Sequence, residues 1–293
     1  MISLVVATMN RTVELDRLLG SLDHQSYRDF ELIIVDQNPD DRLLPLLHLH
    51  AGLVIQHLRS ERGISRARNV GLRMAKGDII AIPDDDCWYP QHLLASVKGW
   101  FESHPSVGLL STGLRTADNR PSVPNLPATP LLCTRSGVWG CAISTVLFMR
   151  RSVATTVGGF DEELGVGAAS PYQAGEEIDY VLRALDHGFQ MWHDPSLTVH
   201  HPSISSVEHL TRTTYSYALG TGRVQRIHHY PLHRLGWHLI RTFGGAAVRL
   251  CHGDLVRAQV YVLRGAGQIA GYLSDGSRTS FGSSLLNSQP ADK

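Results

Sequence analysis

The sequence has little charge and no long apolar run. Charged residues make up 18% of its 293 residues, and 27 Lys and Arg balance 27 Asp and Glu. A formal net charge of zero gives no reason to expect nucleic acid as a partner. No stretch reaches the roughly 18 uninterrupted apolar residues of a membrane-spanning helix. The apolar start also lacks the preceding basic residues of a signal peptide, so we expect a cytoplasmic protein.

Cysteine is scarce. The four cysteines show no Cys-x-x-Cys spacing, which argues against a zinc ribbon and against a disulfide framework. Hydrophobic residues nevertheless make up 43% of the chain, enough for a packed core and too many for a disordered protein. The length fits one large α/β domain or two modest ones.

The charges are unevenly distributed. Between Arg212 and Arg264 there are eight arginines, no lysine and a single acid, Asp254, which gives this segment a net charge of +7. The rest of the chain therefore carries −7. A basic C-terminal segment attached to an acidic body indicates a surface with a separate role.

Apolar patterns predict alternating strands and helices. The runs at 2–7 and 30–35 flank a segment whose leucines recur at helical spacing, and this βαβ unit predicts a parallel sheet. Further strands are expected at 53–58, 78–82, 142–149 and 197–200, and helices at 62–75 (with Ser65 as N-cap), 90–102 and 176–187. We expect a loop over 118–136, a mobile glycine-rich segment over 158–175 and two or three basic helices over 207–273.

Polar residues follow three of the predicted strands. Thr8 and Asn10 end the first, Asp36 ends the second, and Asp84–Asp86 follow the fourth. Ligands of open parallel sheets bind at the carboxyl ends of the strands, so these residues form a candidate site.

The three consecutive aspartates repel one another, and a bound divalent cation relieves that repulsion. Carboxylate oxygens suit Mg²⁺ or Mn²⁺. His200 and His201, at another strand end, are of a type that also binds such ions. The alternatives are a solvated acidic turn and hydrogen-bonded surface histidines.

Three acids, Glu176, Glu177 and Asp179, open the helix that follows the glycine-rich segment. They suit either a general base aimed at the site or ordinary placement of acids in a first helical turn. The sequence Gly265-Ala-Gly-Gln-Ile-Ala270 matches a dinucleotide-binding pattern, but no strand precedes it, so we reject that interpretation.

Five segments together resemble the family-2 glycosyltransferases, inverting enzymes with a GT-A fold that use nucleotide-sugar donors. They are VVATMNR at 5–11, DFELIIVDQNPDD at 29–41, RGISRARNVGLRMAKGDIIAIPDDDCWYP at 62–90, VGGFDEELGVG at 157–167 and AGEEIDYVLRALDHG at 174–188. The resemblance implies a mostly parallel, Rossmann-like central sheet flanked by helices, with a C-terminal helical segment. The resemblance covers about the first two hundred residues and implies a catalytic domain over 1–206. The charge and composition of the remaining residues predict a basic helical segment over 207–273 and a flexible, Ser- and Gly-rich tail over 274–293.

The resemblance assigns roles to the candidate residues. Around the nucleotide and diphosphate it implies Thr8, Asn10, Asp36, Arg66, Arg68, Asn69 and Asp84. For Mn²⁺ or Mg²⁺ it implies Asp84, Asp85 and Asp86, with His200 or His201. We expect Asp85, in the middle of the run, to be a direct ligand of the metal. Glu177 stands where the family places its catalytic base, with Glu176 and Asp179 beside it. Two departures are Pro83, where many members carry Asp, and Glu177, where Asp is usual.

The expected function is transfer of a sugar from a UDP-, GDP- or dTDP-linked donor to the hydroxyl of a saccharide or lipid-linked acceptor, of the kind used in bacterial surface-polysaccharide synthesis. A sugar-1-phosphate nucleotidylyltransferase would need a glycine-rich loop after the first strand, where TMNRTVE stands instead. A non-catalytic nucleotide-sugar binder would be expected to lack the acids at 84–86 or 176–179. The net positive charge and helical pattern of residues 207–273 predict peripheral contact with the inner face of the cytoplasmic membrane. The alternative is that these arginines pair with the acidic body of the protein.

Overall fold

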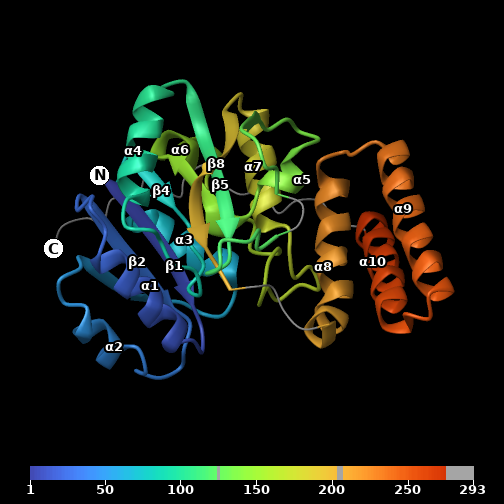
Figure 1. Ribbon diagram of the computed structural model, residues 1–293, viewed down its shortest axis with the longest axis horizontal. Coiled ribbons are helices and arrows are strands. Elements are labelled where there is room, and N and C mark those ends of the chain that lie inside the picture. Colours follow the sequence, from blue (N-terminus) through green and yellow to red (C-terminus); the bar gives the residue numbers. More distant parts are fainter. Residues whose placement is uncertain (124–125, 203–206, 275–293) are drawn as a thin grey trace.

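The computed structural model describes residues 1–123, 126–202 and 207–274, with 207–212 as backbone only. One sheet of eight strands runs through its larger part, in the order β3-β2-β1-β4-β7-β5-β8-β6 (Figure 1). The strands are β1 (Ile2–Thr8), β2 (Phe30–Asp36), β3 (Ile55–Arg59), β4 (Ile79–Ala81), β5 (Val107–Arg115), β6 (Leu131–Leu132), β7 (Leu147–Arg150) and β8 (Gln190–His200). Strands β3, β2, β1 and β4 are mutually parallel, whereas β7 is antiparallel to both of its neighbours.

Helices cover both faces of the sheet, because alternate side chains of the central strands point to opposite faces. Ile2, Leu4 and Val6 of β1 join a core with α1 (Val13–Asp23) and α4 (Leu93–Ser103). On the other face, Val5 joins a second core formed with α3 (Ile64–Met74), α5 (Val138–Cys141), α6 (Arg151–Val157) and α7 (Glu176–Asp186). A short helix, α2 (Leu44–Leu49), precedes β3. This layering confirms the expected α/β fold.

Several local predictions were wrong. Ser65 lies inside α3, where its hydroxyl donates to the Leu164 carbonyl, and Gly63 caps the helix instead. Within the strand expected at 142–149, Ser144–Val146 form a 3₁₀ turn, and the strand β7 begins only at Leu147. The loop expected over 118–136 contains the short strand β6. Strand β5 and helix α6 were not predicted, and β8 begins seven residues earlier than expected.

Three long helices stand to one side of the sheet: α8 (Val207–Ile227), α9 (Leu232–Cys251) and α10 (Leu255–Leu273). Helix α10 packs between α8 and α9 (Figure 1). The approach of α8 to α10 depends on glycine, since a Cβ on Gly222 would lie 2.1 Å from the Gln268 carbonyl oxygen. A Cβ on Gly267 would lie 2.5 Å from the Tyr215 carbonyl oxygen, and a Cβ on Gly265 would lie 2.5 Å from the Phe243 ring. The glycines of the rejected dinucleotide pattern therefore serve helix packing.

None of the helices in the described part of the chain combines the length and the apolar character needed to cross a bilayer. The tail expected over 274–293 lies, from residue 275 onward, outside the described residues.

Candidate active site

The carboxyl ends of β1, β2 and β4 bring the predicted polar residues to one edge of the sheet. Thr8 and Asp36 are paired in register, and Asp84 forms a bridge with Ala7. This edge is therefore built from three segments that are far apart in the sequence, as the parallel topology predicts.

Asp36 anchors the side of the edge formed by β1 and β2. Its buried carboxylate accepts hydrogen bonds from the Asn38 backbone N–H at 2.8 Å, and it lies 3.0 Å from the His57 ring and 3.2 Å from the Arg59 guanidinium. Asn10, at a positive φ of 60°, donates its backbone N–H to the Asn38 side chain at 2.7 Å. These bonds fix the two loops that follow β1 and β2.

Asp85 is held by the loop after β1, and Arg11 of that loop pairs with both Asp85 and Asp86. The Asp85 carboxylate accepts the Thr8 hydroxyl at 2.7 Å and the Arg11 guanidinium, also at 2.7 Å. Burial raises the pKa of Asp85 to about 6, although Arg11 and Thr8 oppose that shift. Asp85 thus ties the loop after β1 to the loop after β4.

Asp84, Asp86 and His201 form the group best suited to a cation. One potential ligand atom from each lies within 4.8 Å of the other two, and His201 Nε2 lies 3.0 Å from an Asp86 oxygen. Burial opposes charge on Asp86 and on His201, but their contact outweighs it, lowering the pKa of Asp86 and raising that of His201. Asp85 and His200 lie outside this group, and His200 stacks on Trp88 at 5.4 Å. Asp85, which we expected as a direct ligand, is not in this group, and its oxygens bond Thr8 and Arg11 instead.

A buried arginine connects this group to the acids of α7. Arg68 donates to Glu176 at 2.8 Å and to Asp84 at 3.3 Å, and it is only 2% exposed. The hydroxyls of Ser144 and Thr145 also donate to Asp84. Asp84 is therefore held in place from three sides.

The three acids at the start of α7 have different environments. Glu176 is buried against Arg68, whereas half-buried Glu177 forms no ion pair within the described residues. Burial, reinforced by the charge of Glu176, raises the pKa of Glu177 well above its ordinary value. Both Asp179 oxygens are engaged, one by Arg183 and the other by His228, each at 2.8 Å. Among the three acids, Glu177 is the one without an ion pair in the described part of the chain.

Arg66 and Asn69 hold the glycine-rich segment rather than joining the acids. Arg66 pairs with Glu61 and Glu162, and Asn69 bonds the Phe160 backbone through both its donor and its acceptor. The Ile64 N–H also donates to the Val166 carbonyl at 3.0 Å. The segment expected to be mobile is thus fastened to α3.

Sequence reasoning did not single out the partners of the acids: Arg11, Ser144, Thr145 and Tyr217. Arg11 stands in the first of the five segments that resemble the family, and this position could have identified it as a residue of the site. Tyr217 of α8 is close enough to Glu176 and Glu177 that their charges add to the effect of burial in raising its pKa. Only the tertiary structure reveals this proximity of α8 to the site.

Comparison with known proteins shows the family to which the chain belongs. The sequence model of Glycosyl transferase family 2 matches residues 3–155. An uncharacterized glycosyltransferase of Haemophilus influenzae is 32% identical over 111 residues, and a PGL/p-HBAD biosynthesis glycosyltransferase of Mycobacterium tuberculosis is 29% identical over 115 residues. Each match covers 38% of this chain, and 37% and 45% of the respective relative.

Two solved structures are similar in fold. S. aureus TarS 1-349 in complex with UDP-GlcNAc has a TM-score of 0.59 at 14% identity, covering 92% of this chain and 90% of TarS 1-349. The mannosyltransferase PcManGT from Pyrobaculum calidifontis, in complex with GDP-Man and Mn²⁺, has a TM-score of 0.57 at 19% identity, covering 92% and 73%. The matched family region and the shared architecture show that this chain belongs to glycosyltransferase family 2 and has a GT-A fold.

Proposed function

We propose that the chain is an inverting, metal-dependent glycosyltransferase that moves a sugar from a nucleotide-sugar donor to an acceptor hydroxyl. The observation that carries this proposal is the Arg68 bridge, which joins a candidate metal ligand, Asp84, to the acid pair that contains Glu177. A cation site and a proton acceptor at one strand edge are the two elements that such a transfer needs.

The residues present fit Mn²⁺ or Mg²⁺. Asp84 and Asp86 offer carboxylate oxygens and His201 offers an imidazole nitrogen, with the three potential ligand atoms within 4.8 Å of one another. When bound, a divalent cation would offset the charge that develops on the departing nucleoside diphosphate. Asp85 would instead position this loop through Thr8 and Arg11.

Glu177 would act as the general base. The acceptor oxygen forms a bond to the anomeric carbon as the bond from that carbon to the diphosphate oxygen breaks. The diphosphate keeps the electron pair, and Glu177 takes the acceptor proton. A single displacement of this kind inverts the anomeric configuration. The raised pKa of Glu177 makes it a stronger base than an ordinary carboxylate.

The donor would occupy the edge beside these groups. We assign Thr8, Asn10 and Asp36 to the side that receives the nucleoside, and Arg68 to the diphosphate. Arg66 and Asn69 would act indirectly, by holding the 158–175 segment over this side. The complexes of TarS with UDP-GlcNAc and of PcManGT with GDP-Man support a nucleotide-sugar donor.

We propose a saccharide or lipid-linked acceptor in cell-surface polysaccharide synthesis, used at the inner face of the cytoplasmic membrane. The PGL/p-HBAD relative and the exposed basic helices support this proposal. Among the described residues, no arginine of α8–α10 forms an ion pair with residues 1–202, so the alternative of pairing with the acidic body gains no support.

The test is a screen of UDP-, GDP- and dTDP-sugars for thermal stabilisation, first with Mn²⁺ and then with Mg²⁺. Nucleotide release from the stabilising donor is then measured with and without saccharide acceptors. Metal-dependent stabilisation followed by acceptor-stimulated release is the expected result. Stabilisation without any turnover would favour a non-catalytic binder.

A further inference from the structure

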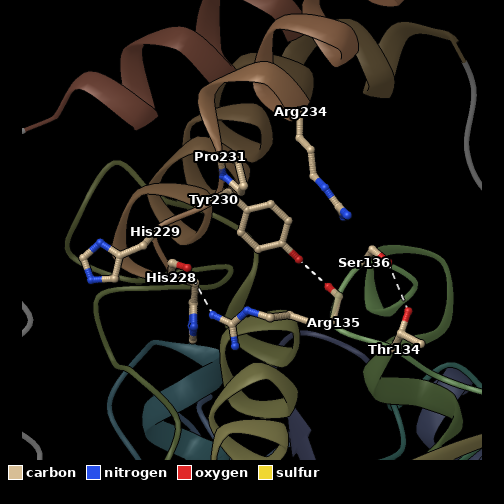
Figure 2. Close-up of a pocket in the computed structure, with 8 residues that line it drawn as sticks. All are labelled: Thr134, Arg135, Ser136, His228, His229, Tyr230, Pro231 and Arg234. Atoms are coloured by element: carbon tan, nitrogen blue, oxygen red, sulfur yellow. Dashed lines mark hydrogen bonds between the residues drawn. The ribbon is translucent and has the colours of Figure 1, made fainter.

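A cavity of about 360 Å³ lies apart from the acid-lined edge. It is formed by the loop Thr134–Ser136 and by the junction of α8 and α9, through His228–Pro231 and Arg234 (Figure 2). Helix α7 lies between the two places. Glu177 is in its first turn, whereas Asp179 and Asp186, two and nine residues further along, contact His228 and Arg135 of the cavity. The cavity therefore lies on the side of α7 that is opposite Glu177.

Hydrogen bonds fix the wall of this cavity. Arg135 pairs with Asp186 and donates to the His228 carbonyl at 3.1 Å. The Tyr230 hydroxyl donates to the Arg135 carbonyl and accepts the Trp139 indole N–H at 2.6 Å. The loop and the helix junction are therefore joined before any ligand arrives, which lowers the entropic cost of binding.

The cationic and hydroxyl side chains of the cavity suit an anion. Arg234 forms no ion pair within the described part of the chain, and its side chain extends from α9 toward the loop that carries Ser136 (Figure 2). On that loop the hydroxyls of Thr134 and Ser136 share one hydrogen bond at 3.1 Å, so one of the two hydroxyl protons is left to donate to a ligand. A guanidinium and hydroxyl donors around a fixed cavity form a suitable site for a phosphate group.

An exposed apolar face continues from the cavity along α9. Trp237, Ile240 and Val248 are 61%, 66% and 57% exposed, and their spacing places them on one side of the helix. Arg234 and Arg241 flank this face. Helices α9 and α10 contain no acid, and Asp254 between them is already paired with Arg249 and Arg257. Exposed apolar side chains beside unpaired arginines favour the headgroup region of an anionic membrane.

We propose that this cavity binds the phosphate of an anionic membrane lipid, while Trp237 and Ile240 enter the interface beside it. This lipid site is independent of the proposed glycosyl transfer. It assigns a different task to each of two similar arginines. Arg234 would contact a bound phosphate directly, whereas Arg241, seven residues further along the same helix, would contribute only general attraction to the surface.

Sedimentation of the full chain with vesicles tests the proposal. Vesicles of phosphatidylcholine alone are compared with vesicles that also contain phosphatidylglycerol. We expect the chain to bind only the vesicles that contain phosphatidylglycerol. Arg241→Ala should weaken this binding about fivefold. Arg234→Ala should weaken it more than tenfold, because that variant also loses charge-assisted hydrogen bonds to the phosphate. Equal losses in the two variants, or equal binding to both vesicle types, would overturn the lipid site. Both arginines are exposed, and circular dichroism checks that each variant is folded.

A second measurement separates a lipid from a soluble phosphate compound. Inorganic phosphate and glycerol phosphate are titrated into the wild type, Arg234→Ala and Trp237→Ala. A lipid site predicts weak phosphate binding that Arg234→Ala removes and Trp237→Ala leaves unchanged, with vesicle binding weakened in both variants. Arg234-dependent phosphate binding without any vesicle binding would overturn the lipid and indicate a soluble phosphate ester. Sugar transfer to a soluble acceptor should be unchanged in Arg234→Ala, so this test can fail without the proposed function failing.

Discussion

The strand-end edge and the α9–α10 helices use charge in opposite ways. At the edge, Asp85 is paired with Arg11, Asp86 with His201, and Glu176 with Arg68. Along α9, the arginines at 234 and 241 face solvent among exposed apolar side chains. The charged groups of the edge are thus paired with one another inside the fold. The two arginines of α9 are exposed and can bind a partner outside the chain.

This difference has an energetic consequence. Burial of a charged group costs desolvation free energy unless the group is paired and hydrogen-bonded. The buried charges of the edge therefore need several hydrogen bonds each. Glu177 is the exception there, since it is half-buried and forms no ion pair among the described residues. Within the edge we therefore expect substitutions of paired acids and arginines to affect structure, and substitution of Glu177 to affect turnover.

The largest effect is expected from Glu177→Gln. The amide preserves size and hydrogen bonding but cannot accept a proton, so turnover should fall by about 10²–10⁴-fold. Donor binding, followed by thermal shift, should be unchanged. Near-normal turnover would mean that Glu176 or Asp179 is the base. It would also contradict the claim that Glu177 serves turnover while the paired acids serve structure.

The next effect concerns stability. Arg68→Met leaves Glu176 buried without its partner and should lower the free energy of unfolding by about 3–5 kcal/mol. Arg66→Met is the matched control on the same helix, because its partners are at the surface, and it should cost about 1 kcal/mol or less. Urea denaturation measures both. Equal losses would show that the Arg68 bridge is no more important than a surface ion pair.

Adjacent histidines give a sharper comparison within the edge. His201→Ala should weaken Mn²⁺ affinity at least about tenfold, because His201 lies with Asp84 and Asp86. His200→Ala should change that affinity little, because His200 stacks on Trp88. Isothermal titration with Mn²⁺ and nucleoside diphosphate distinguishes them. A larger loss in His200→Ala would mean that the ligand set is incorrectly assigned.

The smallest effect is a displaced pH profile. A general base acts in its deprotonated form, so activity should fall as the pH decreases through the pKa of Glu177. Since burial raises that pKa, the fall should begin well above the pH at which an ordinary glutamate titrates. A profile of kcat against pH that stays flat down to about pH 5 would contradict this role.

The sequence was informative where a pattern is local. Buried strands such as Phe30–Asp36 are continuous apolar runs, and the aspartates after β4 follow directly from one. Strand β5 was missed because polar Ser111 and Thr112 are buried within it. The first part of β8 was missed because Pro195 stands in its middle, at a shift in register beside Gly113, where the strand tolerates a proline.

The site itself was only partly predictable. The five segments identified the acids, but which acids pair depends on contacts across the fold, such as Asp85 with Thr8 at a separation of 77 residues. The cavity at His228–Pro231 was missed for the same reason. Its two walls are about 90 residues apart in sequence, and a histidine pair alone carries no signal of a binding site.

The stereochemistry of donor hydrolysis tests the central claim most directly, because water can replace an unidentified acceptor. The chain is incubated with the donor selected by the thermal screen, such as an α-linked UDP-sugar, and ¹H NMR follows the sugar released before its anomers equilibrate. Single displacement at the strand-end edge predicts that the β anomer appears first and that Glu177→Gln suppresses its formation. Initial release of the α anomer, or equal rates in the two proteins, would contradict inversion with Glu177 as the base.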